Sequence, residues 1–181
     1  MAKEREFRDS VHAAYLMLES IEVLLTKLEE TTYLRKSGLS YPQFLILLAT
    51  EASKPPVSET DVAGSVQHNL NTVSMIIDRM AKLGLVKRVR SGKDRREVHV
   101  SLTPLGREKL RRGVEVGVAI RERLGNAFSD EEMQRAMLLM GKMSNQLHKE
   151  TGREPIPADA TSPLRENVLE IFRKYGPQKT T

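Results

Sequence analysis

The sequence predicts a mainly α-helical fold that includes one small β-hairpin. Apolar residues recur every three or four positions through most of the 181-residue chain, which is the spacing of amphipathic helices. Polar and apolar residues alternate only around residues 85–102, on either side of a run of turn-forming residues. Aromatic residues make up only 4% of the chain, so we expect a core built from Leu, Ile, Val, Met and Ala.

The N-terminal part of the chain predicts two helices. Residues 7–33 carry an apolar side chain at every third or fourth position and form a long amphipathic helix, which ends before Gly38. Ser40 begins the second helix, and Pro42 is tolerated in its first turn. The run Phe44–Ala49 is too apolar for a surface helix, so we expect this second helix to lie in the core.

Two shorter helices follow, joined by a polar turn. Ser58 is an N-cap with Asp61 three residues later, an approximate capping box, and it begins a helix over residues 59–66. Asn69 can cap the next helix, over residues 70–83, whose apolar side chains recur on one face. The sequence therefore predicts a helix-turn-helix in this part of the chain.

The pattern then changes to two predicted strands, residues 85–90 and 97–102, joined by a turn over residues 91–94. The stretch Lys87–Arg96 holds six Lys and Arg against one Asp, so its excess charge equals the net charge of +5 of the whole chain. A hairpin this basic can lie on the phosphates of a nucleic acid or enter a narrow minor groove.

The C-terminal part predicts two further long helices and a tail. The first covers residues 104–124 and the second residues 130–149, with Ser129 in a good capping box. Residues 151–163 contain three Pro and are predicted to form a linker. Residues 164–175 place apolar side chains along one side and could form one short amphipathic helix.

A short helix, a tight turn, a second helix and a basic hairpin are the parts of a winged helix-turn-helix. A helix fits the major groove of DNA, so the residues near its N-terminal end should be small, polar and able to form hydrogen bonds. The residues at that position are Asn69, Asn71, Thr72 and Ser74. The candidate DNA contacts on the hairpin are Lys87, Arg88, Arg90, Lys93, Arg95 and Arg96.

These motifs together resemble the MarR family of bacterial and archaeal regulators. The resemblance rests on five segments: Leu70–Ser74, Ile77–Met80, Leu83–Val86, Lys93–Arg96 and Val100–Gly106. The spacing from Thr72 to Gly106 is a highly specific match, and the general helical layout extends the resemblance over residues 7–150.

The resemblance implies a domain division and a set of partners. Residues 1–38 and 103–150 would form a helical dimerisation domain, residues 39–102 the winged helix-turn-helix, and residues 151–181 a linker and C-terminal extension. The family implies an obligate homodimer that binds double-stranded DNA at a pseudo-palindromic operator. Its members are usually repressors, often released by a small phenolic or carboxylated ligand.

The resemblance also assigns roles to individual residues. It places Asn71, Thr72 and Ser74 at recognition positions, and Arg95 and Arg96 on the wing. Asp94 resembles the residue that braces the wing through an ion pair, for which Arg79 is a possible partner. Met75 is a departure, because the family often has Arg at this position.

Other chemistry is excluded or finds no motif. The absence of Cys excludes disulfides, thiolate metal sites and thiol-based redox sensing. The four His residues show no helical ligand spacing, so we expect no metal and no cofactor. The sequence contains no nucleophile–base motif or phosphate loop, so we do not expect an enzyme. No apolar run approaches a membrane span of about 20 residues, so we expect a cytoplasmic protein.

Several interpretations remain open at this stage. Tyr15, Tyr33 and Tyr41 are most simply packing residues, but all three could also line a cleft for an aromatic ligand, with Tyr15 and Tyr41 as the candidate ligand-binding residues. Met133, Met137, Met140 and Met143 form a stripe that suits core or dimer packing better than a ligand site. The chain could also be a ligand-independent DNA-binding protein. A third possibility is a protein-interaction module with the tail helix as its binding motif.

Overall fold

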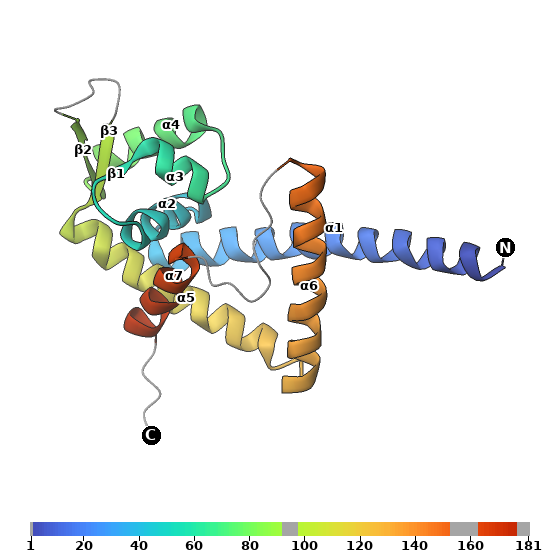
Figure 1. Cartoon of the computed structure of the whole chain (residues 1–181). Coiled ribbons are helices and arrows are strands. Elements are labelled where there is room, and N and C mark those ends of the chain that lie inside the picture. Colours follow the sequence, from blue (N-terminus) through green and yellow to red (C-terminus); the bar gives the residue numbers. More distant parts are fainter. Residues whose placement is uncertain (1, 92–97, 153–162, 177–181) are drawn as a thin grey trace.

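A computed structural model describes residues 2–91, 98–152 and 163–176 (Figure 1). Its elements are α1 (Ala2–Ser37), α2 (Tyr41–Ala52), β1 (Val57–Ser58), α3 (Glu59–Ser65), α4 (Leu70–Lys82), β2 (Val86–Arg90), β3 (Val98–Leu102), α5 (Pro104–Gly125), α6 (Asp130–Glu150) and α7 (Pro163–Tyr175). The predicted fold class, mainly helical with a small sheet, is confirmed. In these three stretches, no helix is long and apolar enough to cross a membrane.

The helices begin where the sequence places capping residues. Ser40, Ser58 and Ser129 each form a complete capping box with the residue three positions later. The side chains of Asn69 and Thr103 accept hydrogen bonds from backbone N–H groups of the first turn of α4 and α5. These hydrogen bonds satisfy donors that the helix itself leaves free, which explains why the predicted starts of these five helices were accurate.

The sheet has one strand more than the predicted hairpin. Its antiparallel order is β1–β3–β2, with Val57 opposite Val100 and Arg88 opposite Val100 on the other side. β1 is only two residues long, too short to show any alternation in sequence. β2 remains an edge strand, so one side of the basic strand faces away from the sheet.

The core is centred on α2, which packs against α1, α3, α4, α5, α7 and β3. Most buried side chains are aliphatic, as expected, but Tyr33 and Phe44 are among the largest that are fully buried. Their ring centroids lie 4.5 Å apart, and Tyr41 adds a third ring 5.4 Å from Tyr33. Gly113 makes room for this cluster, because a Cβ at that position would lie 2.5 Å from the Phe44 ring.

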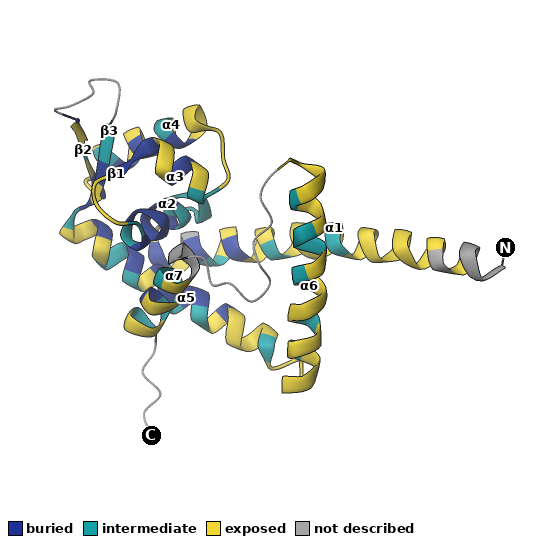
Figure 2. Ribbon diagram, in the orientation of Figure 1, coloured by how far each residue is buried: buried dark blue, intermediate teal, exposed yellow. Residues whose placement is uncertain are grey.

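The N-terminal half of α1 projects from the body, and the ribbon of α6 crosses that of α1 in this view (Figures 1 and 2). None of the residues of α6 is buried. In the predicted methionine stripe, Met137 and Met140 are 64% and 53% exposed, while Met133 and Met143 are partly buried. The stripe therefore does not belong to the core of the single chain.

The tail forms the predicted short helix, α7, which packs against α5 and α2. Most of the predicted linker, residues 153–162, lies outside the described residues. The two glycines that follow α1 and α4 take the left-handed conformation that ends a helix, with φ of +70° at Gly38 and +71° at Gly84.

Candidate nucleic-acid interface

The N-terminal end of α4 presents polar side chains to solvent. Val73 and Ile77 are buried on its inner face, whereas Asn69, Asn71 and Thr72 are exposed on the outer side. The Asn69 side chain accepts a hydrogen bond of 2.8 Å from the backbone N–H of Asn71, which fixes the start of the helix. The exposed amides and hydroxyl can form hydrogen bonds with base edges or phosphates.

Ser74 lies one turn further along α4 and is already bonded within the protein. Its hydroxyl donates a 2.6 Å hydrogen bond to the Glu59 carboxylate, and Glu59 is only 7% exposed. Since Glu59 is the first residue of α3, this bond ties the two helices of the helix-turn-helix together. A DNA contact by Ser74 remains a prediction, and it would require the hydroxyl to share or leave this bond.

Arg88 also pairs with carboxylates of the protein itself. Its Nε atom lies 2.7 Å from Glu59 Oε1, and its guanidinium also pairs with Asp78 on α4. The Arg88 side chain is 28% exposed, whereas that of Glu59 is 9% exposed. Arg88 therefore fastens strand β2 to α3 and α4, an arrangement that would brace the wing from its base.

The other two basic side chains of β2 are exposed to solvent. Lys87 and Arg90 are exposed on the edge strand and can reach a phosphate backbone. Arg79 is exposed on α4. The predicted wing residues Lys93, Asp94, Arg95 and Arg96 lie outside the described residues, so their DNA contacts and the Asp94–Arg79 brace remain predictions.

Glu59 and Asp78 are site residues that the sequence analysis missed. From the sequence, Glu59 is only an acidic residue in the first turn of a predicted helix, where such side chains are common. Asp78 belongs to a family-like segment but had no assigned role. A signal in the sequence is the occurrence of three acidic residues, Glu59, Asp61 and Asp78, within a helix-turn-helix that should face a polyanion.

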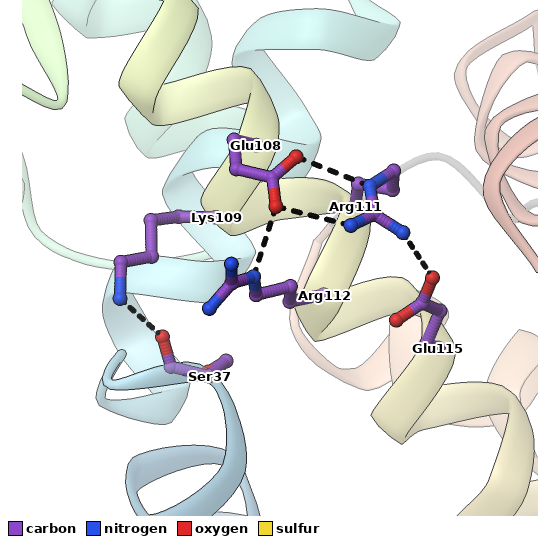
Figure 3. A network of polar contacts seen from close by, with 6 residues as sticks. All are labelled: Ser37, Glu108, Lys109, Arg111, Arg112 and Glu115. Carbon is purple, nitrogen blue, oxygen red and sulfur yellow. Dashed lines mark hydrogen bonds and ion pairs between the residues drawn. The ribbon is translucent and has the colours of Figure 1, made fainter.

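Three basic side chains of α5, Lys109, Arg111 and Arg112, form hydrogen bonds with groups of α5 and α1 (Figure 3). The Glu108 carboxylate accepts a 3.0 Å hydrogen bond from Arg111 and a 2.9 Å hydrogen bond from Arg112. These hydrogen bonds lower the pKa of Glu108 to about 2. Lys109 donates a 2.8 Å hydrogen bond to the Ser37 carbonyl and so joins α5 to the end of α1. This part of α5 is consequently a weaker candidate for DNA contact than β2.

The two candidate ligand residues lie far apart within one chain. Tyr15 is 52% exposed on the projecting half of α1, whereas Tyr41 packs beside Tyr33. Eighteen residues of helix separate Tyr15 from Tyr33, which corresponds to about 27 Å. Burial raises the pKa of Tyr41, and the nearby carboxylate of Glu29 raises it further. Tyr41 is therefore a protonated hydroxyl in a partly buried site.

The family model of the MarR family matches residues 37–97, which hold the helix-turn-helix and the basic strand. The HTH-type transcriptional regulator YdcH of Bacillus subtilis, itself uncharacterized, is 30% identical over 111 residues, covering 60% of this chain and 73% of YdcH. The chain belongs to the MarR family. The predicted resemblance is therefore confirmed, and the family consists of transcription regulators rather than enzymes.

Two further relatives of this MarR-family chain differ in how much they share with it. The HTH-type transcriptional regulator MgrA of Staphylococcus aureus is 39% identical over 69 residues, which is 38% of this chain and 46% of MgrA. The chain thus spans about half the length of that relative. The crystal structure of Streptococcus pneumoniae FabT in complex with DNA is 27% identical with a TM-score of 0.62. That match covers 97% of FabT but only 78% of this chain, so this chain has segments without a counterpart there.

Proposed function

We propose that this MarR-family chain is a homodimeric transcription regulator that binds a pseudo-palindromic DNA operator. The observation that carries the proposal is the exposed polar start of α4 beside the basic edge strand β2, both anchored on Glu59. A helix set in this way can enter the major groove while the cationic strand follows the backbone. The similar FabT protein has been solved in complex with DNA, which supports DNA as the partner.

The dimer is supported by apolar surface that one chain leaves in water. On α1, Leu16, Met17 and Leu24 are 65%, 69% and 66% exposed, and on α6 Leu139 is 65% exposed. Soluble monomers rarely expose apolar patches of this extent, and such patches usually mark an interface. We propose that a second copy of the chain covers them, with residues 1–38 and 103–150 as the dimerisation domain.

We further propose repression that a small aromatic or carboxylated ligand relieves. A pocket with an apolar lining and a few polar tips is the usual form of such a site, and Tyr41 beside Tyr33 offers one half of it. Tyr15 can join Tyr41 only if it comes from the other copy of the chain, because helix α1 holds the two apart in one copy. The ligand site would then exist only in the dimer.

The alternative of a protein-interaction module that uses the tail helix has less support. Ile171 of α7 is only 7% exposed and packs in the core, so the apolar face of the tail helix is already occupied. The basic strand with exposed Lys87 and Arg90 also has a direct use in DNA binding.

The test is selection of operator DNA from a random pool by the full chain, followed by affinity measurements at several salt concentrations. We expect enrichment of an inverted repeat whose half-sites are about one helical turn, roughly 34 Å, apart. Asn71→Ala should reduce the difference in affinity between the selected site and random DNA, by about 1–3 kcal/mol if a base contact is lost. A chain that enriches no sequence, or binds with no salt dependence, would contradict the proposal.

A further inference from the structure

Helix α7 is amphipathic, and its apolar face is docked on the body of the protein. Ile171 is buried, and Val168 and Phe172 are partly buried against the core. Leu169 lies on the other side of the helix and is 44% exposed. This helix lies outside residues 37–97, which the family model matches, so the family assignment gives it no role.

The first anchor of α7 is on the helix-turn-helix side of the chain. The side-chain amide of Asn167 donates a 2.7 Å hydrogen bond to the carbonyl of Ala52, the last residue of α2. The final carbonyls of a helix have no partner within the helix, so Asn167 supplies one of the missing donors. Val168 is partly buried against the core, and with Leu45 and Leu48 of α2 it lines an open pocket of about 260 Å³.

The second anchor of α7 is on α5, in the helical domain. The guanidinium of Arg121 lies 4.7 Å from the centroid of the Phe172 ring, within the range of a cation–π contact. Gly117 permits this approach, because a Cβ at that position would lie 2.6 Å from Arg121 and 3.3 Å from Phe172. The same Cβ would lie 2.4 Å from the hydroxyl of Tyr33. The Phe172 ring therefore packs where α1 and α5 meet.

The two anchors lie on different parts of the proposed regulator. α2 belongs to residues 39–102, which carry the recognition helix, whereas α5 belongs to the dimerisation part. A change in the angle between these parts would break the Asn167–Ala52 hydrogen bond or separate Phe172 from Arg121. Packed elements of this kind hold discrete arrangements rather than deforming continuously.

We infer that α7 is a positioning helix that fixes the angle between the DNA-reading lobe and the dimerisation helices, and thereby the separation of the two recognition helices. The inference rests on the proposed dimeric DNA-binding function. An operator demands one separation, so a lobe whose angle is already fixed loses less conformational freedom on binding. Random DNA is bound mainly through phosphate contacts, so its affinity should depend less on the separation of the two recognition helices.

The experiment compares Phe172→Ala with Leu169→Ala, which removes an apolar side chain from the exposed side of the same helix. Neither variant changes the net charge. Phe172→Tyr keeps the ring over Arg121 and tests rescue. For each full-length protein, below its melting temperature, we would measure affinity for the selected operator and for random DNA of equal length. Amide hydrogen exchange of α7 reports whether the helix stays docked.

We expect Phe172→Ala to accelerate exchange in α7 and to weaken operator binding by about fivefold or more, within the usual 5–150-fold range of coupling between sites. Binding to random DNA should change far less, and Leu169→Ala and Phe172→Tyr should match the wild-type chain. Fast exchange in α7 with unchanged operator affinity would overturn the inference, because α7 would then only add stability. Equal losses on both DNAs would also overturn it. A wild-type chain that does not distinguish the two DNAs would instead defeat the proposed function, and the positioning role with it.

Discussion

Arg88 of β2 and Glu59 of α3 form an ion pair at 2.7 Å, with the carboxylate almost fully buried. The second oxygen of the same carboxylate accepts the hydrogen bond from Ser74 of α4. The Glu59 side chain thus joins strand β2 and helix α4 to helix α3. An arginine that the sequence assigns to DNA is therefore placed to hold the reading elements in their relative positions.

Replacing Arg88 should destabilise the fold more than replacing its exposed neighbour Arg90. Arg88→Ala leaves the buried Glu59 carboxylate without its cation, and breaking a buried pair from one side costs about 3–5 kcal/mol. Because Arg88 is partly exposed, we expect the loss at the lower end of that range. Arg90→Ala should change the free energy of unfolding by no more than about 0.5 kcal/mol. Chemical denaturation of both variants measures the difference.

A double-mutant cycle measures the interaction energy between Glu59 and Arg88 apart from the effect of each single substitution. Glu59→Gln combined with Arg88→Gln should show a coupling energy of about 0.5–3 kcal/mol, as expected for residues in direct contact. If the two single effects simply add, the ion pair contributes nothing of its own to the wing.

Basic residues of the wing and polar residues of α4 should affect DNA binding in different ways. Arg90→Ala or Arg95→Ala should weaken binding to any DNA and reduce the salt slope by about one unit per lost phosphate contact. Asn71→Ala should instead lower the preference for the operator, by about 1–3 kcal/mol if a base contact is lost. Binding titrations at several salt concentrations, on operator and on random DNA, distinguish the two. The assignment fails if both classes lose affinity equally on both DNAs.

Ser74→Ala provides a further comparison with Asn71→Ala on the same helix. Both substitutions remove a polar side chain from the recognition helix, but only Ser74 is bonded to Glu59. We therefore expect Ser74→Ala to lower the free energy of unfolding by about 1–3 kcal/mol, because the buried carboxylate loses a donor. Asn71→Ala should leave stability nearly unchanged, since that side chain is exposed.

The exposed apolar face of α1 and α6 should be a dimer interface. Light scattering at micromolar concentration should give twice the chain mass of 20.4 kDa. Leu16→Glu or Leu139→Glu should shift the protein toward that single-chain mass, because each places a charge in the surface to be buried. Leu169→Glu, on the exposed side of α7, is the matched control and should remain dimeric. A wild-type chain that elutes as a monomer would contradict the interface.

The start of α3 should give a defined pH dependence of stability. Hydrogen bonds from the side chain and backbone of Ser58 lower the pKa of Asp61. A carboxyl group whose pKa is lowered by folding adds stability above its unfolded pKa of about 3.9, and this is lost as the pH falls through the lower folded value. Asp61→Asn should remove that part of the acid dependence, so its unfolding curve should approach that of the wild type below about pH 4. Ser58→Ala should cost about 0.5–2 kcal/mol at neutral pH.

Much of the fold was predictable because its signals are local. Capping residues such as Ser40, Ser58 and Ser129 mark helix starts within three or four residues of sequence. The ion pair between Glu59 and Arg88 was not predictable, because it joins residues that only the folded lobe brings together. The polar, exposed start of α4 could be predicted from the sequence, and its role in reading DNA stays a prediction. The hydrogen bond of Ser74 to Glu59 could not be predicted, because it depends on a partner in α3. The docking of α7 was not predictable either, because Phe172 packs against Arg121 beside Gly117, and both of these residues lie about 50 positions earlier in the chain.

The last prediction concerns the ligand switch. A small aromatic acid that binds beside Tyr41 can change DNA affinity only if it prefers one arrangement of the two lobes over the other. A coupling of about 1–3 kcal/mol would weaken operator binding 5–150-fold, and operator DNA must weaken ligand binding by the same factor. Calorimetric titration of aromatic acids, with and without operator, measures both affinities. Tyr41→Phe should weaken the ligand and leave operator binding intact, since it removes only a hydroxyl. A ligand that binds equally well with and without operator is not an effector, whereas a chain that binds none of them but still selects its operator would be a ligand-independent regulator.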